Sequence, residues 1–283
     1  MPKIGVGKWC AKVVRESGVR KMANQQVQIH QTAIVHDRAE LGQGVQVGPY
    51  AIIGANVKLG DRVVVDAHAV VDGRTTIGPE TRIHSFASIG SRPQDLKFAG
   101  EDTELLIGSR NMIREYANIS LGTVGGGGKT VIGDGNLFMV YTHIAHDCVV
   151  GNECIFANGA AIAGHAVIGD KAVFGGLSAL HQFCLVGDMV MVAAGAIVTQ
   201  DVPPFVMVHG NRAQPSGLNV VGLRRSGLSH AQISEVKAAY RLIYNDNLPI
   251  EEARARIAAE TEDAGIMAKF LDFLAASKRG VCR

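Results

Sequence analysis

The sequence predicts an all-β solenoid, a parallel β-helix of hexapeptide repeats, followed by a small C-terminal α-helical domain. Apolar side chains recur every six residues without a miss over residues 41–89, and a second unbroken run covers residues 132–198. A small or β-branched residue stands two positions before each apolar residue of the first run, and glycine often follows, as at Gly42 and Gly48. Period six suits neither a helix nor simple strand alternation, but it is typical of a three-sided coil with one hexad per side.

The bulk composition agrees with this fold class. The chain has 283 residues, of which 34 are glycine, 47% are hydrophobic, 19% are charged and only 5% are aromatic. A core of small and β-branched side chains with frequent turns has this balance, which is otherwise ordinary for a globular protein. The formal net charge of +2 gives no general reason to expect nucleic acid as a partner.

The first element is an N-terminal extension, residues 1–28. It scatters basic residues through a weak apolar pattern and lacks the unbroken run of about 7–15 apolar residues that a secretory signal needs. No run in the chain approaches the roughly 20 apolar residues of a membrane helix. We therefore expect a cytoplasmic protein without an integral membrane segment. Met22 is an alternative start, and an amphipathic peripheral anchor is an alternative interpretation of residues 1–21.

The second element is the β-helix, residues 29–210, with three hexads or 18 residues per coil. The apolar residue of each hexad and the small residue two before it point inward, where successive coils share one continuous core. The glycine after the apolar residue is expected to support the bend at a corner. Cys148, Cys154 and Cys184 occupy the small inward position, so we interpret them as buried apolar side chains. The absence of a C-x-x-C pair excludes zinc-ribbon and thioredoxin motifs.

Two stretches interrupt the repeat, and a solenoid places such insertions outside as loops that often carry function. The first, residues 91–106, contains Asp95 and Lys97, which form either a solvated pair or part of a site. The second, residues 121–130, is rich in glycine. It lacks the spacing and the following helix of a phosphate-binding loop, so we expect a flexible flap.

The third element, residues 211–283, is expected to be helical. Ser229 with Gln232 three residues later is the arrangement of a capping box, and apolar residues follow at helical spacing. A second helix should begin near Pro249, and a third should end near residue 277. Their apolar faces should rest either on the last coils or on a neighbouring subunit.

Four histidines gather within about two coils of the second run. His143, His146, His165 and His181 all avoid the inward positions, so they should lie on or near the outside. Surface residues without a role, a zinc site and a general base are the alternatives. A zinc site needs a defined set of ligands with supporting partners, and no third ligand stands at a matching spacing, so we predict no metal.

A neutral histidine beside an acid is a ready general base, and Asp147 directly follows His146. Consecutive strand residues normally point to opposite faces. A direct contact between the two side chains therefore requires a corner of the coil at this position.

The segments QDLKFAG, HIAHDC, AGH, HQFC and QDVPPFV stand in the order and spacing of the UDP-N-acetylglucosamine O-acyltransferases of lipid A synthesis, within the hexapeptide-repeat acyltransferase superfamily. The resemblance covers residues 29–283, and the motifs are together highly specific. It implies a left-handed β-helix, although crossovers elsewhere favour the right hand. It also implies a homotrimer with active sites between subunits.

The resemblance further implies a reaction. A (R)-3-hydroxyacyl chain passes from acyl carrier protein to the 3-hydroxyl of UDP-N-acetylglucosamine, without a cofactor and without an acyl-enzyme. His146 matches the general base, whose assistance typically contributes about 10²–10⁴-fold. The backbone N–H of Gly164 matches the donor to the tetrahedral oxyanion.

Other residues match substrate contacts of that family. Asp95 matches a residue that holds the glucosamine, whereas Lys97 and His181 match residues near the diphosphate and acyl groups. Asn219 and Arg225 match contacts on the nucleotide side. The implied substrate-binding residues are Gln94, Asp95, Lys97, His143, His165, His181, Gln182, Asn219 and Arg225.

Four positions bear on specificity. Ala194 matches the position that limits the acyl groove, and its small side chain implies a chain of intermediate length. Ser120 and Val221 stand where well-known members have histidine and glutamate, and Ser226 replaces an arginine beside Arg225. The change at Ser120 leaves a 3-amino UDP-sugar as an alternative acceptor.

Three other functions compete within the same fold. An N-acyltransferase acting later in the pathway carries an N-terminal uridine-binding domain, for which hexads beginning by residue 29 leave no room. A zinc-dependent carbonic anhydrase and a non-catalytic scaffold are the remaining alternatives. Arg212, Arg224 and Arg225 can attract an acidic carrier protein or form a solvated face.

Overall fold

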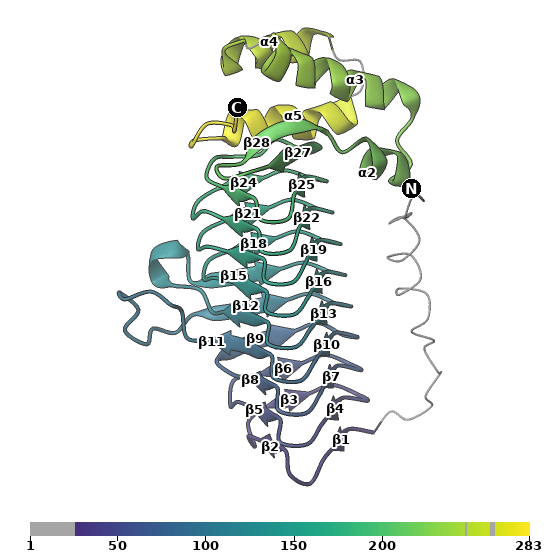
Figure 1. Ribbon diagram of the computed structural model, residues 1–283. Helices are drawn as coiled ribbons and strands as arrows, with labels where there is room; N and C mark the ends of the chain where they lie inside the picture. Colours follow the sequence, from purple (N-terminus) through teal and green to yellow (C-terminus); the bar gives the residue numbers. More distant parts are fainter. Residues whose placement is uncertain (1–25, 247, 261–263) are drawn as a thin grey trace, which may run out of the picture.

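The structure, a computed structural model, describes residues 26–246, 248–260 and 264–283. The chain winds into an elongated three-sided prism, and helices cover its C-terminal end (Figure 1). The predicted β-helix is confirmed, and it is left-handed. Residues 1–25, with the alternative start at Met22 and the suggested peripheral anchor, lie outside the described residues.

Each side of the prism is one sheet, in which each strand up to β26 that has a later neighbour pairs in parallel with the strand three further along the chain, except that β25 pairs with β27. Sheet A contains β1 (Gln28–Ile29), β4 (Gln46–Val47), β7 (Val64–Val65), β10 (Arg82–Ile83), β13 (Met112–Ile113), β16 (Leu137–Phe138), β19 (Ile155–Phe156), β22 (Val173–Phe174), β25 (Met191–Val192), β27 (Val206–His209) and β28 (Gln214–Leu218). Sheet B contains β2 (Ile34–Val35), β5 (Ile52–Ile53), β8 (Val70–Val71), β11 (Ser88–Ser91), β14 (Asn118–Ser120), β17 (His143–Ile144), β20 (Ala161–Ile162), β23 (Ala179–Leu180) and β26 (Ile197–Val198). Sheet C contains β3 (Glu40–Leu41), β6 (Lys58–Leu59), β9 (Arg74–Ile77), β12 (Glu104–Ile107), β15 (Lys129–Ile132), β18 (Val149–Val150), β21 (Val167–Ile168) and β24 (Leu185–Val186).

The six-residue period produces this register directly. His143 of β17 pairs with Ala161 of β20, its equivalent one coil later. Inside the prism, Phe138, Phe156 and Phe174 stack with ring centroids 5.0 and 5.1 Å apart. This distance matches the usual spacing of about 4.8 Å between paired strands, so equivalent side chains of successive coils touch and fill the core.

The small inward positions are buried as expected. Cys148, Cys154 and Cys184 are fully buried among aliphatic side chains and carry free thiols. Burial raises the pKa of the Cys148 and Cys154 thiols to about 12. These groups are therefore core side chains without nucleophilic character.

The physical reason for glycine after the inward apolar residues differs from the one that we expected. A Cβ on Gly60 would lie 2.8 Å from the backbone nitrogen of Pro79 on the next coil, so glycine is needed for close approach between coils. The bend itself falls two residues later, at residues such as Arg62 and Glu80, which adopt positive φ. Their N–H groups donate to the preceding coil, as Arg62 does to the Gln43 carbonyl at 2.8 Å. Our prediction that the glycine after the inward residue supports the bend is therefore wrong at positions such as Gly60.

Both interruptions leave the prism at the corner between sheets B and C (Figure 1). One runs from β11 to β12, and the other runs from β14 through the 3-10 turn η2 (Val124–Gly126) to β15. Both loops are shorter than predicted, because Glu104–Leu106 and Lys129–Thr130 already pair as strands.

The C-terminal region starts with strand rather than helix. β28 pairs antiparallel with β27 and extends sheet A, so the prediction that residues from 211 onward are helical is wrong at its start. The helices are α2 (Val220–Arg225), α3 (His230–Tyr240) with its π-helical continuation η3 (Arg241–Asn245), α4 (Ile250–Glu260) and α5 (Ala264–Ala276). Ser229 and Gln232 form the predicted capping box.

The helices rest on the last coils. The Phe270 ring of α5 lies 6.3 Å from that of Phe205, and Lys269 Nζ bonds Asp188 Oδ2 at 2.6 Å. Of the two alternatives predicted for the apolar faces of these helices, packing on the last coils therefore holds. Among the described helices, none combines the length and the apolar character needed to cross a bilayer.

Candidate active site

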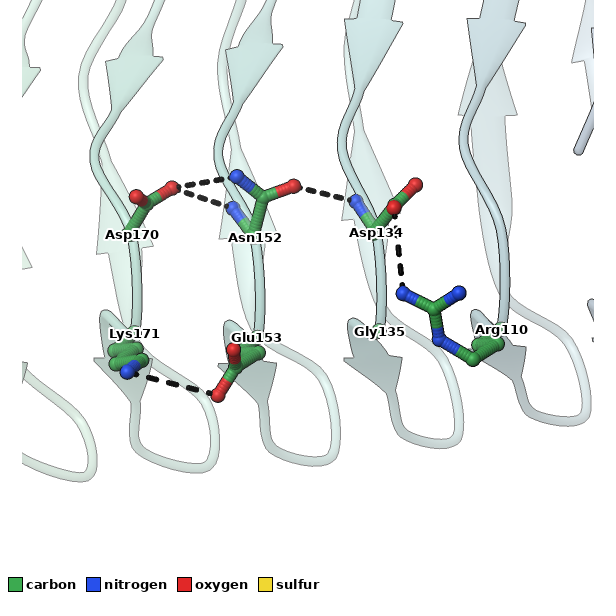
Figure 2. A pocket seen from close by; sticks show the side chains of 7 residues that line it. All are labelled: Arg110, Asp134, Gly135, Asn152, Glu153, Asp170 and Lys171. Carbon is green, nitrogen blue, oxygen red and sulfur yellow. Dashed lines mark hydrogen bonds and ion pairs between the residues drawn. The ribbon is translucent and has the colours of Figure 1, made fainter. Parts of the chain in front are cut away.

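A hollow at the corner between sheets C and A contains a row of polar side chains that satisfy one another (Figure 2). Asp170 Oδ1 accepts hydrogen bonds from the backbone and side-chain nitrogens of Asn152 at 2.8 and 2.9 Å. Asn152 Oδ1 in turn accepts the Asp134 N–H at 2.8 Å. Because each of these side chains caps an amide of the preceding coil, we interpret this row as part of the scaffold. The hollow is lined by Arg110, Asp134, Gly135, Asn152, Glu153, Asp170 and Lys171.

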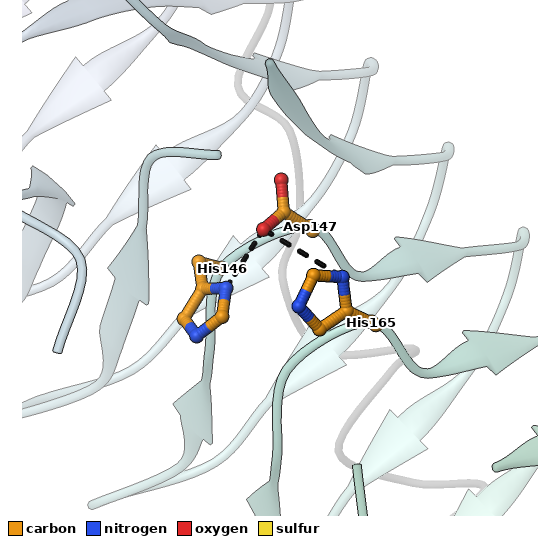
Figure 3. Close-up of side chains that lie close together, drawn as sticks. All are labelled: His146, Asp147 and His165. Carbon is orange, nitrogen blue, oxygen red and sulfur yellow. Dashed lines mark hydrogen bonds and ion pairs between the residues drawn. The ribbon is translucent and has the colours of Figure 1, made fainter. Parts of the chain in front are cut away.

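The predicted histidines meet at a different corner, between sheets B and C, directly above the two loops. His146 and Asp147 follow β17, and His165 follows β20 one coil later. His146 Nδ1 lies 2.7 Å from Asp147 Oδ2, and His165 Nδ1 lies 3.8 Å from the same oxygen (Figure 3). The two imidazole rings meet edge to face at a centroid distance of 5.0 Å.

The contact between neighbours in sequence has a backbone cause. Asp147 occupies the corner position and has a φ of 60°, so its side chain turns to the same side as His146. The structure thus contains the corner of the coil that a direct contact between these two side chains requires. The Asp147 side chain is fully buried, whereas that of His146 keeps 15% of its surface exposed.

The hydrogen bonds define which nitrogen of His146 carries the proton. The Asp147 carboxylate also accepts the Thr123 backbone N–H at 2.7 Å and the Thr123 hydroxyl at 2.6 Å. An ionised carboxylate only accepts, so His146 donates from Nδ1. Its Nε2 therefore keeps a lone pair, which is the arrangement of a general base oriented by a buried acid.

Gly164 lies against the free side of this imidazole. A Cβ there would come within 2.7 Å of His146 Cε1 and 2.9 Å of Nε2, so only glycine leaves room for the ring. Among the described residues, no hydrogen-bond acceptor is recorded for the Gly164 N–H. A free amide donor thus stands beside the free Nε2, as an oxyanion site requires.

Two neighbours of His146 on this face, His143 and His165, remain neutral more easily than in water. Burial lowers the pKa of His143, and the nearby His146 adds to the effect. Burial also lowers the pKa of His165, although the charges of Asp147 and Asp95 oppose it. Asp95 of the first loop thus acts on the same corner, while its own Oδ1 accepts the Lys97 backbone N–H at 2.9 Å.

His143 is held from below by a polar chain on the outer face of sheet B. Its Nδ1 lies 2.9 Å from Asn118 Oδ1, and Asn118 Nδ2 donates to Ser91 Oγ at 2.9 Å. Ser91 Oγ lies 3.5 Å from the hydroxyl of the buried Ser120. Sequence reasoning missed Asn118 and Ser91, although Asn118 falls in the column of outward positions below His143.

The cluster of His146, Asp147 and His165 offers three ligand atoms within 4.8 Å of one another, so its fit to a metal ion can be tested. Two ligands at about 2.0–2.2 Å from one tetrahedral ion lie more than about 3 Å apart. The 2.7 Å between His146 Nδ1 and Asp147 Oδ2 is instead a hydrogen-bond distance. The donor set is therefore arranged for proton handling, and its geometry does not fit a bound zinc ion.

The remaining predicted residues are spread over three places. Gln94 and Lys97 are exposed on the first loop, near the histidine corner. His181 and Gln182 are exposed after β23, on the coil above Gly164. Ala194 is exposed after β25, at the corner between sheets A and B.

Asn219 and Arg225 lie away from the histidines. Asn219 caps α2 by accepting the Gly222 N–H at 2.9 Å, and it donates to the Met189 carbonyl at 2.9 Å, which belongs to the corner between sheets C and A. Figure 1 shows α2 on the opposite side of the prism from the loop after β11. Within one chain, these two residues and His146 do not line a common site.

Two family profiles match the chain. Residues 129–164 match the bacterial transferase hexapeptide (six repeats), and residues 201–282 match domain 2 of UDP-N-acetylglucosamine O-acyltransferase. Both matches fall on elements described above. The first covers the coils with His143, His146 and Gly164.

Whole-chain relatives agree with these matches. The acyl-[acyl-carrier-protein]–UDP-N-acetylglucosamine O-acyltransferase of Neisseria gonorrhoeae is 55% identical over 255 residues, which are 90% of this chain and 99% of that protein. The enzyme of the same name from Herminiimonas arsenicoxydans is 47% identical over 259 residues, with the same coverage. The crystal structure of UDP-N-acetylglucosamine O-acyltransferase from Moraxella catarrhalis has a TM-score of 0.88 at 43% identity, covering 90% of this chain and 99% of that one. With identity at this level over nearly the full length of its relatives, the chain belongs to the acyl-[acyl-carrier-protein]–UDP-N-acetylglucosamine O-acyltransferase family.

Proposed function

We propose that this protein transfers a (R)-3-hydroxyacyl chain from acyl carrier protein to the 3-hydroxyl of UDP-N-acetylglucosamine, the first step of lipid A biosynthesis. Family membership supports the reaction type, because the relatives carry the donor and the acceptor in their names. The observation that carries the assignment of roles is the pair of a free His146 Nε2 and a free Gly164 N–H beside the buried Asp147.

In the proposed mechanism His146 Nε2 removes the proton from the sugar 3-hydroxyl as its oxygen attacks the thioester carbonyl. Asp147 stabilises the imidazolium that forms, and the Gly164 N–H donates to the tetrahedral oxyanion. Collapse of this intermediate breaks the carbon–sulfur bond. The departing carrier thiolate takes the proton from the imidazolium, so the enzyme returns to its starting state without a cofactor.

We assign the surrounding residues to the substrates. Asp95 is assigned to the glucosamine, and its charge acts on His165 at the histidine corner. Lys97 and Gln94 on the same exposed loop are assigned to the diphosphate side, and His181 and Gln182 to the wall of the cleft. Ala194 is assigned to the end of the acyl groove.

We also propose a homotrimer in which a second copy completes each site. Asn219 and Arg225 lie too far from His146 to act with it in one chain, which supports sites shared between subunits. The corner between sheets A and B has a row of stacked rings at centroid distances of 5.0–5.2 Å. These rings belong to Tyr50, His68, Phe86, Tyr116 and Tyr141, and the tyrosines and Phe86 are 47–63% exposed. A continuous exposed apolar ridge of this kind is typical of a surface that another chain covers.

The cytoplasmic location predicted from the sequence is part of the proposal. The described cysteines 148, 154, 184 and 282 are free and buried, which suits a reducing compartment.

The direct test is an acyl-transfer assay with UDP-N-acetylglucosamine and carrier proteins loaded with 3-hydroxyacyl chains of different length. His146→Ala should lower kcat by at least about 100-fold, because base assistance contributes on this order. His36→Ala is a matched control, since His36 Nδ1 also lies 2.7 Å from the adjacent Asp37 but on an exposed surface. Wild-type turnover in the His146→Ala variant would overturn the assignment of His146 as the general base. Stoichiometric zinc in the purified protein would favour the alternative function, a zinc-dependent carbonic anhydrase.

A further inference from the structure

We propose that Thr123 of the glycine-rich loop is a positioning residue for the reaction, because it fixes the Asp147 carboxylate in the orientation that serves His146. The inference rests on the proposed function of His146. It gives the loop of residues 121–130 a defined role, where the sequence suggested only a flexible flap.

The first observation is a two-point attachment. Thr123 donates its backbone N–H to Asp147 Oδ1 at 2.7 Å and its hydroxyl to Asp147 Oδ2 at 2.6 Å. Both residues are buried, with 6% of their surface exposed. Two donors from one residue define the plane of the carboxylate, so Oδ2 has one remaining direction, toward His146 Nδ1.

The second observation is that the loop is tied to Asp147 at both ends. Thr130, where the chain rejoins sheet C, accepts the Asp147 backbone N–H on its hydroxyl at 2.8 Å. The insertion between β14 and β15 thus starts at the side chain of Asp147 and ends at its backbone. A solvent-exposed flap has no need of such contacts, whereas a support for the acid requires them.

The third observation concerns Gly126, in the turn η2 over the same carboxylate. A Cβ on Gly126 would collide with all three atoms of the Asp147 carboxylate group. Gly126 does not have positive φ, unlike Gly127 and Gly128. Glycine is therefore required here for close approach rather than for backbone conformation, and the turn closes the carboxylate off from water.

These contacts make a chain of positioning from Thr123 to Asp147 to His146. An unsupported carboxylate can rotate about its terminal bond, and each rotation breaks the bond that holds the His146 ring. Removing the Thr123 hydroxyl should therefore lower the fraction of enzyme with a correctly oriented base. Substrate binding should be unaffected, because Thr123 is buried behind Asp147.

The test is a double-mutant cycle in the acyl-transfer assay. Thr123→Val should lower kcat about tenfold, part of the contribution of the base, and leave KM for both substrates unchanged. Thr123→Ser should restore most of the rate. In an Asp147→Asn background, Thr123→Val should cost little further, because coupled residues are not additive. Thr81→Val is the matched control: Thr81 is buried and its hydroxyl bonds backbone groups, far from the site.

A purely structural role gives different results. In that case Thr123→Val lowers the melting temperature as Thr81→Val does, and its effect on kcat is absent or is the same in the wild-type and Asp147→Asn backgrounds; either result overturns the proposal. If Thr123→Val does not fold, the same cycle with Gly126→Ala decides. A normal Thr123→Val variant beside an inactive His146→Ala variant rejects only the positioning role, whereas a wild-type enzyme without acyl transfer rejects the proposed function.

Discussion

A histidine followed by aspartate occurs more than once in this chain, and only the surroundings separate the cases. His36–Asp37 and His146–Asp147 both place Nδ1 2.7 Å from a carboxylate oxygen. The Asp37 side chain is 90% exposed, so water screens its charge and the pair contributes little. Asp147 is fully buried and bonded on both oxygens, so its orientation and charge act on one partner. The difference lies in the loop that packs against the Asp147 carboxylate, which a dipeptide pattern does not contain.

His84 gives a prediction for the pH dependence of stability. Burial lowers its pKa from the ordinary value of 6.5, against the pull of Asp66, whose Oδ2 lies 3.2 Å from Nδ1. The unfolded chain therefore binds a proton at higher pH than the folded one. The stability that neutral His84 contributes is present above about pH 6.5 and is lost as the pH falls toward the lower folded pKa.

The free energy of unfolding, measured by urea titration at pH 7 and pH 5, should fall less in His84→Gln than in the wild type. The substituted side chain does not titrate, so its share of the proton uptake disappears. His143 and His165 also have lowered pKa values, so part of the decrease in the free energy of unfolding should remain in the variant. Identical losses in the variant and the wild type would contradict the assignment to His84.

At the scale of the element, the unit is one coil, and its stability depends on how closely it approaches the next. Gly175 and Gly176 are neighbours after β22 and provide a matched pair. A Cβ on Gly175 would collide with the backbone of Ala194 on the next coil, whereas one on Gly176 meets only the Asn158 carbonyl at 3.5 Å, an ordinary contact. Gly175→Ala should therefore cost about 2 kcal/mol by overpacking, and Gly176→Ala should be nearly neutral. Chemical denaturation of the two variants measures this, and equal losses would show that the close approach is unimportant.

The coils could be predicted because each inward position must hold an apolar side chain that fills the core. The period of six is therefore unbroken wherever the core is continuous. The hand could not be derived from it, because a period does not distinguish left from right. β28 was missed because its residues, QPSGL, contain both proline and glycine, which weaken strands, and do not alternate between apolar and polar side chains. The corners were assigned to glycine because glycine tolerates positive φ, yet Arg62 and Glu80 hold that conformation with inter-coil hydrogen bonds.

The site divides in the same way. His143, His146 and His165 were found because their outward positions follow from the repeat. Thr123 escaped because it lies in an insertion, where no period relates it to Asp147, and its partner is 24 residues away. Contacts across insertions depend on the path of the loop, which neither composition nor spacing determines.

At the scale of the molecule, the proposed machinery is divided between two corners of one prism. The base, its acid and Gly164 lie between sheets B and C, while Asn219 and Arg225 lie over the corner between sheets C and A. The side chain of Asn219 is already engaged in capping α2, so Arg225, which is exposed, is the better candidate for a contact with the nucleotide. A rigid β-helix has no hinge that would bring the two corners together. The proposed site shared between subunits would resolve this separation.

Subunit mixing tests the shared site. His146→Ala removes the base and Arg225→Glu reverses the charge of the nucleotide contact, so each variant alone should be inactive. If neighbouring subunits supply the two residues, denaturing and refolding the variants together at equal amounts should restore activity in about a quarter of the sites, because each site draws both parts independently. Mixing His146→Ala with Asp147→Asn is the control, since both changes lie at one corner of one chain and no mixed site is whole. No recovery in the first mixture, at normal trimer content, would mean that each chain builds its site alone and that Arg225 acts elsewhere.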